Sequence, residues 1–450
     1  MNNINILLIN PYIHDFALYD LWVRPHGLLK AASVLERQGC EIDLINCLDR
    51  KDPDIATYYK RNTPRFDEYD CGKFPKTQIE KPQEIENVSR RYYRYGIPVE
   101  LFRKKLAQAT KPDAIILTSI MTYWYPGVVE TIKITKEQFP DTPVILGGIY
   151  PIICPEHARK HTGADYILKN PQLNHLINII NAIVDHSFDK SKCVEDIIPA
   201  YHLLKNNNAA ALQTSVGCPF SCTYCASKLI EPHFIQRDHD SIIKELTHYH
   251  DLGIENIAFY DDAVLYKAES HFIPLMKKIL ENNLHFYFHT PNALHARYIT
   301  PEVASLIKLL DFRTIRLGIE TTIPEKQKDT GDKVTNTEIE QALTNLNNNG
   351  FTSREIEMYL LVGLPGQTVD DVKRDIAFIH NLGAHILLAS YSSIPGTIEW
   401  TRAVKNGFIS EDLDPLWHNH TICPSINPAF SIEIIRELRH ETKRLNNELN

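Results

Sequence analysis

Three cysteines lie within a short stretch of the segment SVGCPFSCTYCAS, which covers residues 215–227. Cys218, Cys222 and Cys225 have the spacing C-x3-C-x2-C. Thiolates bind soft metal ions and iron–sulfur clusters. Pro219 and Ser221 favour a loop in this segment over a regular element. The spacing therefore predicts a metal or cluster site on a loop.

Four roles are compatible with such a trio of cysteines. A structural zinc site usually has four ligands, often in two pairs, and no second pair lies nearby. A disulfide would leave one thiol over, and a role in a buried core does not explain three cysteines in a polar loop. A [4Fe–4S] cluster held by three thiolates leaves one iron without a protein ligand, and that iron can bind an exogenous chelator. We favour the cluster.

The composition is that of an ordinary globular protein. The 450 residues are 43% hydrophobic and 23% charged, which allows two or three domains. The net charge of -8 and the absence of a Lys/Arg run disfavour a nucleic-acid partner. The start, MNNINILLINPY, lacks a signal-peptide pattern, and no apolar run reaches the ~18 residues of a membrane span. With nine cysteines, an odd number, the chain is expected in a reducing cytoplasm.

The first part of the chain, residues 1–170, alternates short apolar runs with helical patterns, which predicts a doubly wound, Rossmann-like parallel sheet. The expected strands are 4–10, 41–47, 113–121, 143–149 and 164–169. Residues 50–105 are charged and rich in tyrosine, and we interpret them as an insertion over the strand ends. Residues 171–207 are expected to be a linker that includes one helix.

A second series of strands and helices follows in residues 208–400, which predicts a partial (β/α)6 barrel of the TIM type. The expected strands are 209–215, 256–262, 285–291, 314–320, 356–363 and 385–392. Residues 401–450 form a C-terminal extension that ends in an amphipathic helix. The cysteines follow the first strand of this series, where barrel enzymes place catalytic residues.

The cysteine segment resembles the CxxxCxΦC motif of the radical S-adenosylmethionine (SAM) superfamily, with Tyr224 as the aromatic residue. Further segments resemble later elements of that superfamily in the same order, over roughly residues 208–400. They are FYDDAVL (259–265), FHTPNALH (288–295), RLGIET (316–321), LLVGLPGQT (360–368) and SSIPGT (392–397).

The resemblance implies a [4Fe–4S] cluster on Cys218, Cys222 and Cys225, with SAM bound at the open iron. Reductive cleavage of SAM would then yield methionine and a 5′-deoxyadenosyl radical that abstracts a hydrogen from the substrate. The residues expected at the cofactors are Tyr224, Asp261, Asp262, Arg316 and Glu320. Each has a structural alternative: loop packing for Tyr224, capping for the aspartates, and ion pairing for the other two.

Residues 1–170 resemble the cobalamin-binding domain found in one radical SAM subclass. The segment PVILGGIYPIICPEH (143–157) matches the strand and Gly-Gly turn of that domain, so Gly147 and Gly148 are candidate cobalamin-contacting residues. The DxHxxG lower-ligand motif is absent, since neither His14 nor His26 fits it. A Rossmann-like domain that has lost cobalamin is the rival interpretation.

The resemblance implies an enzyme that acts on a small molecule and takes electrons from a donor such as flavodoxin or ferredoxin. With cobalamin, methyl transfer to an unactivated carbon is the expected reaction. The alternatives are a radical rearrangement, cyclisation or oxidation, and a non-catalytic iron–sulfur or cofactor-binding protein. His418, His420 and Cys423 in WHNHTIC form a substrate-contacting loop, a plain surface loop or a further metal site.

Overall fold

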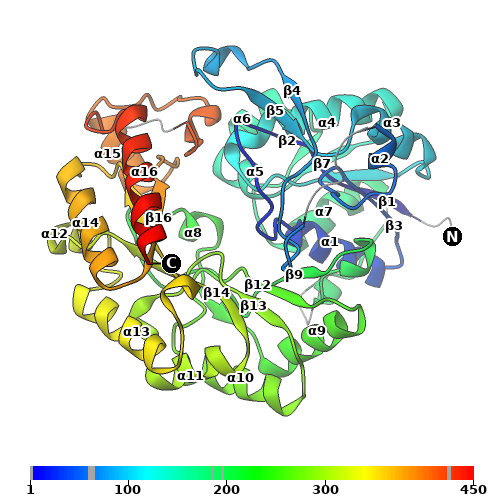
Figure 1. Cartoon of the computed structure of the whole chain (residues 1–450). Helices are drawn as coiled ribbons and strands as arrows, with labels where there is room; N and C mark the ends of the chain where they lie inside the picture. The colour runs from blue at the N-terminus through cyan, green and yellow to red at the C-terminus, as the bar shows by residue number, and fades with distance from the viewer. Residues whose placement is uncertain (1–3, 59–65, 185, 194–196, 423–426, 450) are drawn as a thin grey trace. The chain divides into compact units, whose positions relative to one another are not determined.

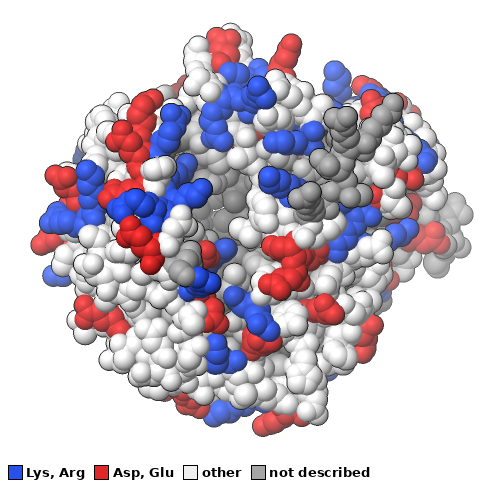
Figure 2. All heavy atoms as spheres, in the orientation of Figure 1, with Lys and Arg blue, Asp and Glu red and all other residues white. Residues whose placement is uncertain are grey.

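The computed structural model describes residues 4–58, 66–184, 186–193, 197–422 and 427–449. The chain divides into two compact units. The N-terminal unit comprises residues 1–207 together with 414–416, and the C-terminal unit comprises 208–413 and 417–450. Within the described residues, no helix is long and apolar enough to cross a membrane. Acidic and basic side chains are interspersed on the face that Figure 2 shows, without a broad basic area.

A five-stranded parallel sheet forms the centre of the N-terminal unit, with the strand order β3-β1-β6-β7-β8. Its strands are β1 (Asn5–Asn10), β3 (Glu41–Asn46), β6 (Ala114–Leu117), β7 (Val144–Leu146) and β8 (Tyr166–Ile167). The middle strands are buried on both faces, as a parallel sheet between two helical layers requires. The doubly wound sheet expected from the sequence is confirmed.

Helices cover both faces of this sheet, with α1 and α7 on one side and α3 and α4 on the other (Figure 1). They are α1 (His26–Arg37), α3 (Val99–Gln108), α4 (Tyr125–Gln138), α5 (Ile149–Ile153), α6 (Pro155–His161) and α7 (Leu173–Val184). Leu176, Ile177 and Ile180 of α7 pack in the main core with strand residues such as Ile6 and Leu8. The stretch expected as a linker thus contributes a helix to this core.

The segment expected as an insertion has regular structure of its own. A three-stranded antiparallel sheet in the order β2-β5-β4 joins β2 (Ile13–Asp15) to β4 (Lys76–Ile79) and β5 (Tyr92–Tyr95). The short helix α2 (Ile55–Tyr58) lies in it, and α3 begins near its end. These elements were not predicted, because tyrosines alternating with charges give no clear helical or strand period.

Six parallel strands form the C-terminal unit, in the order β16-β15-β14-β13-β12-β9. They are β9 (Ala209–Leu212), β12 (Asn256–Phe259), β13 (Tyr287–His289), β14 (Phe312–Glu320), β15 (Ile356–Val362) and β16 (His385–Ser390). Each expected strand is found, often one to three residues shorter at an end. The sequential order of the strands is that of the partial barrel expected from the sequence.

Helices lie on the outer side of these six strands (Figure 1). They are α9 (His239–Asp251), α10 (Phe272–Glu281), α11 (Pro301–Leu309), α13 (Asn336–Asn348), α14 (Val369–Asn381), and, after β16, α15 (Ile398–Lys405) and α16 (Ile432–Glu448). Their starts are encoded locally. Thr335 and Thr368 form capping boxes at the starts of α13 and α14, and the Asp238 side chain accepts a hydrogen bond at the start of α9.

Candidate functional site

The three cysteines lie on a loop that follows β9. Two short antiparallel strands close this loop at its base, β10 (Ser215–Val216) and β11 (Ile235–Gln236). Gly217 has a positive φ of 76°, and a Cβ atom there would collide with the His233 carbonyl oxygen. Cys218 and Cys222 are partly exposed, and Cys225 is exposed. The loop therefore presents its thiols at the carboxyl end of the first barrel strand.

Asp261 anchors the first limb of this loop. Its Oδ1 atom accepts hydrogen bonds from the Thr214 hydroxyl at 2.7 Å and from the Ser215 amide and hydroxyl at 2.6 Å each. Burial raises the pKa of Asp261, while these hydrogen bonds act in the opposite direction. Asp262 is exposed and interacts with the Ser227 hydroxyl. In this structure Asp261 anchors the start of the cysteine loop, and the hydrogen bonds described do not cap the segment that follows it.

The turn after α12 (Pro324–Asp329) supports the middle of the cysteine loop. The Thr223 amide donates to the Thr330 carbonyl oxygen at 3.2 Å. Gly331 has a φ of 116°, and a Cβ atom there would lie 3.0 Å from the Cys222 Cα atom. A side chain at this position would require a shift of a few tenths of an ångström at the second cysteine, so Gly331 belongs to the site although no motif marks it.

Glu320 and Lys333 form an ion pair beside Cys222. Their Oε1 and Nζ atoms are 2.7 Å apart, and both side chains are largely buried. A Cβ atom on Gly318 would collide with the Lys333 ammonium, which explains the glycine in RLGIE. Glu320 has a φ of 67°, and the strand register shifts between Gly318 and Glu320. Such strain in a non-glycine residue is found preferentially at functional sites.

The Glu320–Lys333 pair and the cysteines influence one another electrostatically, as their pKa values indicate. Burial alone would lower the pKa of Lys333, but Glu320 together with Cys222 and Cys225 raises it above the usual range. Burial raises the pKa of the Cys222 thiol and raises that of Cys218 to about 11. Because metal ligands must be thiolates, loading this loop with a metal releases protons. The Lys333 ammonium would stabilise the negative charge that results.

Arg316 and Glu320 were both expected at the cofactors, and in a regular strand they would lie on the same face, but the structure gives them separate partners. The Arg316 Nε atom lies 2.8 Å from the Glu357 Oε2 atom on β15. The Arg316 guanidinium also lies 5.8 Å from the centre of the Tyr359 ring. The register shift in β14 interrupts the alternation of side chains on which the expectation depended.

Two aromatic residues pack the cysteine loop against later strands. Tyr224 packs beside Leu364 and Tyr391, and its hydroxyl forms a hydrogen bond with the Cys222 thiol. Phe220, between the first two cysteines, stacks on His295 with ring centres 4.4 Å apart. His295 is buried, and burial lowers its pKa to about 3. His295 was missed as a loop contact, although FHTPNALH was recognised as a motif.

The donor set of the loop fits a [4Fe–4S] cluster better than a single ion. In the part of the chain that the structure describes, no three His, Cys, Asp or Glu side chains converge as ligands of one metal ion. A cubane cluster attaches each thiolate to a different iron, so its ligands need not converge. Cys40, Cys47, Cys71 and Cys154 belong to the N-terminal unit. A cluster here would have three protein ligands.

The candidate loop WHNHTIC is only partly described. His418 is buried edge-on against Trp400, with ring centres 5.4 Å apart. His420 is exposed, and Cys423 lies outside the described residues. Packing against Trp400 is the role that the structure shows for His418.

In the N-terminal unit, the Gly-Gly turn after β7 is joined to the loop after β6. The Ser119 amide donates to the Gly147 carbonyl oxygen at 3.1 Å. Gly148 has a φ of 94°, and a Cβ atom there would collide with the Ser119 backbone. Gly148 is therefore required by this backbone contact, whether or not a ligand is bound. A Cβ atom on Gly147 would make only ordinary contact with Leu168.

A cluster of aromatic and titratable side chains follows this turn. The Tyr150 hydroxyl lies 2.6 Å from the His157 Nδ1 atom, and the His157 Nε2 atom lies 3.5 Å from the Asp414 carboxylate. Tyr125 stacks on Tyr150 and donates to Asp414 at 3.2 Å. His157 is the last residue of PVILGGIYPIICPEH, the segment that resembles part of the cobalamin-binding domain, so one member of this cluster lies in a motif found from the sequence. Asp414 was missed because it is distant in sequence.

Comparison with known proteins identifies the domain that holds the cysteine loop. Residues 212–379 match the Radical SAM superfamily. This part of the chain is a radical SAM domain. A domain of this superfamily implies an enzyme with a [4Fe–4S] cluster and SAM as cofactors. The match contains the cysteine loop, Asp261, Arg316 and the Glu320–Lys333 pair.

Two solved structures resemble most of the chain. The radical SAM methyltransferase TsrM from Kitasatospora setae has 15% sequence identity and a TM-score of 0.65, over 89% of this chain and 76% of that chain. The cobalamin-dependent SAM radical enzyme OxsB has 14% identity and a TM-score of 0.58, over 100% of this chain and 62% of that chain. At these identities the similarity establishes the fold.

Two curated relatives match about half of the chain each. An uncharacterized methyltransferase of Pyrococcus horikoshii is 24% identical over 254 residues, 52% of this chain and 51% of the relative. The anaerobic magnesium-protoporphyrin IX monomethyl ester cyclase of Rubrivivax gelatinosus is 21% identical over 301 residues, 58% of this chain and 53% of the relative. This chain spans about half the length of each.

Proposed function

We propose that this chain binds a [4Fe–4S] cluster through Cys218, Cys222 and Cys225, cleaves SAM reductively, and transfers a methyl group to an unactivated carbon with the help of cobalamin. The observation that carries the proposal is the supported cysteine loop. Gly331 and the Glu320–Lys333 pair lie against Cys222, the central cysteine of a complete three-thiol motif.

The residues around the loop match the groups that SAM presents. The methionyl part of SAM carries an ammonium and a carboxylate, and Glu320 and Lys333 offer the complementary charges beside Cys222. The cluster and SAM together supply a one-electron cleavage of the C5′–S bond, which yields methionine and a 5′-deoxyadenosyl radical. The role of Glu320 and Lys333 is to orient SAM, and that of the packed aromatic residues is to exclude water.

The N-terminal unit supports cobalamin as the third cofactor. Its strand order, with β1 between β3 and β6, places a topological switch point at the carboxyl ends of β1 and β6, where doubly wound sheets bind ligands. A small crevice at this point is lined by Asn10, Thr118, Ser119 and Trp124. The solved structures that share the fold include TsrM with cobalamin and a [4Fe–4S] cluster bound, and OxsB with aqua-cobalamin bound.

The substrate class proposed is a small molecule, and the electron donor proposed is a flavodoxin or ferredoxin. The face of the molecule in Figure 2 has no broad basic area of the kind that binds a nucleic-acid backbone.

The test is anaerobic reconstitution with iron and sulfide, followed by SAM and a strong reductant, with and without cobalamin. We expect 5′-deoxyadenosine, its loss in Cys222→Ala, and about one cobalamin retained per chain after desalting. S-adenosylhomocysteine formed only with cobalamin would support methyl transfer. Production of 5′-deoxyadenosine without cobalamin retention would favour a rearrangement, cyclisation or oxidation. An intact cluster that neither binds nor cleaves SAM would overturn the enzymatic assignment.

A further inference from the structure

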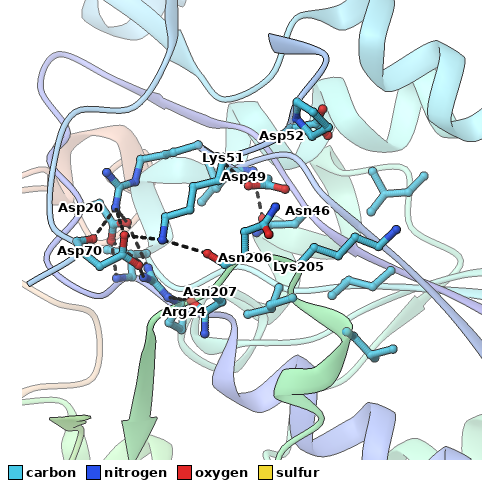
Figure 3. A pocket seen from close by; sticks show the side chains of 18 of the residues that line it. Asp20, Arg24, Asn46, Asp49, Lys51, Asp52, Asp70, Lys205, Asn206 and Asn207 are labelled. Carbon is cyan, nitrogen blue, oxygen red and sulfur yellow. Dashed lines mark hydrogen bonds and ion pairs between the residues drawn. The ribbon is translucent and has the colours of Figure 1, made fainter. Parts of the chain in front are cut away.

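A polar pocket of about 300 Å³ lies at the carboxyl end of β3, in the N-terminal unit (Figure 3). Its lining comes from the loop before α1, from residues that follow β3, and from residues 203–207. This volume is at the low end of the range of small-molecule sites, ~300–1,000 Å³. No residue of the cysteine loop contributes to this β3 pocket, so it is separate from the radical SAM site.

One wall of the β3 pocket is a buried network of ion pairs. Arg24 and Arg50 contact the Asp20 carboxylate at 3.0 and 2.8 Å. Lys51 contacts the Asp70 carboxylate at 2.7 Å. Arg50 is only 6% exposed, and its Nη1 atom is buried without a hydrogen-bond partner. These contacts fix the wall before any ligand binds and leave one donor unsatisfied.

The other wall holds polar atoms that the protein leaves unused. The Asp49 carboxylate accepts one hydrogen bond, from the Lys51 amide at 2.8 Å, and forms no ion pair with any described residue. The Asn46 Oδ1 atom accepts from Asn10 at 2.8 Å and from the Leu48 amide at 3.0 Å, which turns its Nδ2 donor away from those partners. Burial raises the pKa of Asp49, so its carboxylate would be stabilised by further donors.

The charges of the pocket narrow the chemistry of its ligand. Acidic and basic side chains line it in equal numbers: Asp20, Asp49, Asp52, Asp54 and Asp70 against Arg24, Arg50, Lys51, Lys105 and Lys205. The carboxylates disfavour a phosphate, and the polar lining disfavours an apolar compound. Among the described residues no metal-binding group of side chains exists. A neutral, hydroxyl-rich ligand is the class that remains.

We propose that the β3 pocket binds the 2′,3′-diol of a ribonucleoside, with Asp49 accepting hydrogen bonds from the hydroxyls and Asn46 donating to them. In the Rossmann domains that bind dinucleotides, a carboxylate after the second strand binds the ribose 2′-hydroxyl. Asp49 has that position, three residues after β3, and β3 is the neighbour of β1. The segment PYIHDF follows β1 in place of a glycine-rich phosphate loop, so a dinucleotide is not expected.

The test is calorimetric titration of the full chain with adenosine and with 2′,3′-dideoxyadenosine. We expect adenosine to bind, and we expect the dideoxy compound to bind at least tenfold more weakly. Asp49→Ala and Asn46→Ala should each weaken adenosine binding at least tenfold, with Asp49→Asn as the conservative variant if Asp49→Ala fails to fold. Asp141→Asn, an exposed acid outside the pocket, is the matched control.

Adenosine could also bind at the SAM site, so Glu320→Gln serves as a second control. Binding that survives Glu320→Gln and is lost in Asp49→Ala supports the proposal. Absence of adenosine binding, equal binding of the dideoxy compound, or binding that depends on Glu320 and is unaffected by Asp49→Ala would each overturn it.

Discussion

In the C-terminal unit the strands lie side by side in the order of the chain, whereas in the N-terminal unit the order reverses after β1. In the first arrangement each strand delivers its loop to the same rim in turn. The three ligands of the proposed cluster all come from one short loop, and the neighbouring loops support that loop. In the second arrangement a ligand site is shared by loops that are far apart in sequence, such as those after β1 and β6.

The two units also differ in what their buried charges do. Beside the cysteine loop, Glu320 and Lys333 pair with each other and remain close to Cys222. In the N-terminal unit, Asp20 and Asp70 are fully engaged by Arg24, Arg50 and Lys51. In the proposed function the first arrangement would provide charges for SAM, whereas the second holds loops together.

The largest effect is expected from Cys222→Ala. This variant removes one of three cluster ligands, so the reconstituted chain should contain little iron and form no detectable 5′-deoxyadenosine. Ser221→Ala is the matched control, since Ser221 is exposed in the same loop and its hydroxyl accepts a hydrogen bond from Lys228. If iron analysis gave equal iron in Cys222→Ala and in the parent chain, this loop would be ruled out as the cluster site.

Breaking the Glu320–Lys333 pair should weaken SAM binding and lower stability together. Removing one partner of a fully buried pair costs about 3–5 kcal/mol, and a smaller loss is expected here because both side chains retain some exposure. Lys333→Met and Glu320→Gln should not be additive, which a double-mutant cycle on urea unfolding would show. Additive losses would mean that the two residues act independently.

The Gly-Gly turn of the N-terminal unit offers a matched pair. Gly148→Ala combines a positive φ with a backbone collision, so we expect it to lower the free energy of unfolding by about 1–3 kcal/mol. Gly147→Ala should change it by less than about 0.5 kcal/mol, because its Cβ atom would make only an ordinary contact. Chemical denaturation measures both, and equal losses would contradict the assignment of the contact to Gly148.

The contact between Gly331 and Cys222 can be tested by comparison with Gly350, a glycine whose only constraint is its positive φ. Gly331→Ala should lower both stability and iron content, because its Cβ atom would lie 3.0 Å from the Cys222 Cα atom. Gly350 also has a positive φ, of 78°, but has nothing within 4 Å of a Cβ atom. Gly350→Ala should cost about 1 kcal/mol from the backbone alone and leave the iron content unchanged. Equal iron contents in the two variants would argue against the Gly331 support.

The last prediction concerns a pH dependence that arises from a buried histidine of the barrel. The His289 ring bonds Thr314 at 2.7 Å and Asn256 at 3.0 Å. Burial, with smaller effects of Arg316 and Arg313, lowers the pKa of His289 from 6.5 to about 3. Below pH 6.5 the unfolded chain binds a proton that the folded chain rejects, so stability falls as the pH falls towards 3. This residue should contribute up to about 1.4 kcal/mol per pH unit.

The measurement is urea unfolding between pH 7 and 4.5, with His289→Gln as the comparison. The variant should be less stable at pH 7 and should show a shallower loss with falling pH. A slope identical to that of the parent chain would show that His289 is not the group responsible.

The sequence was most informative where a local pattern of residues is enough to specify an element or a site. The apolar runs of the two parallel sheets placed the strands. The C-x3-C-x2-C loop could be recognised because its spacing is local. Gly331, Lys333 and His295 were not predicted, because their importance arises from contacts made only in the folded chain. The Arg316–Glu357 pair joins two neighbouring strands that are far apart in the sequence, so no local pattern marks it.

The central claim is that this loop carries a cluster with one iron free to bind SAM. Electron paramagnetic resonance of the reconstituted and reduced chain, recorded with and without SAM, tests it most directly. We predict a [4Fe–4S]⁺ signal that shifts when SAM is added, and no such cluster signal in Cys222→Ala. A cluster signal that SAM leaves unchanged, or one that persists in Cys222→Ala, would contradict the claim.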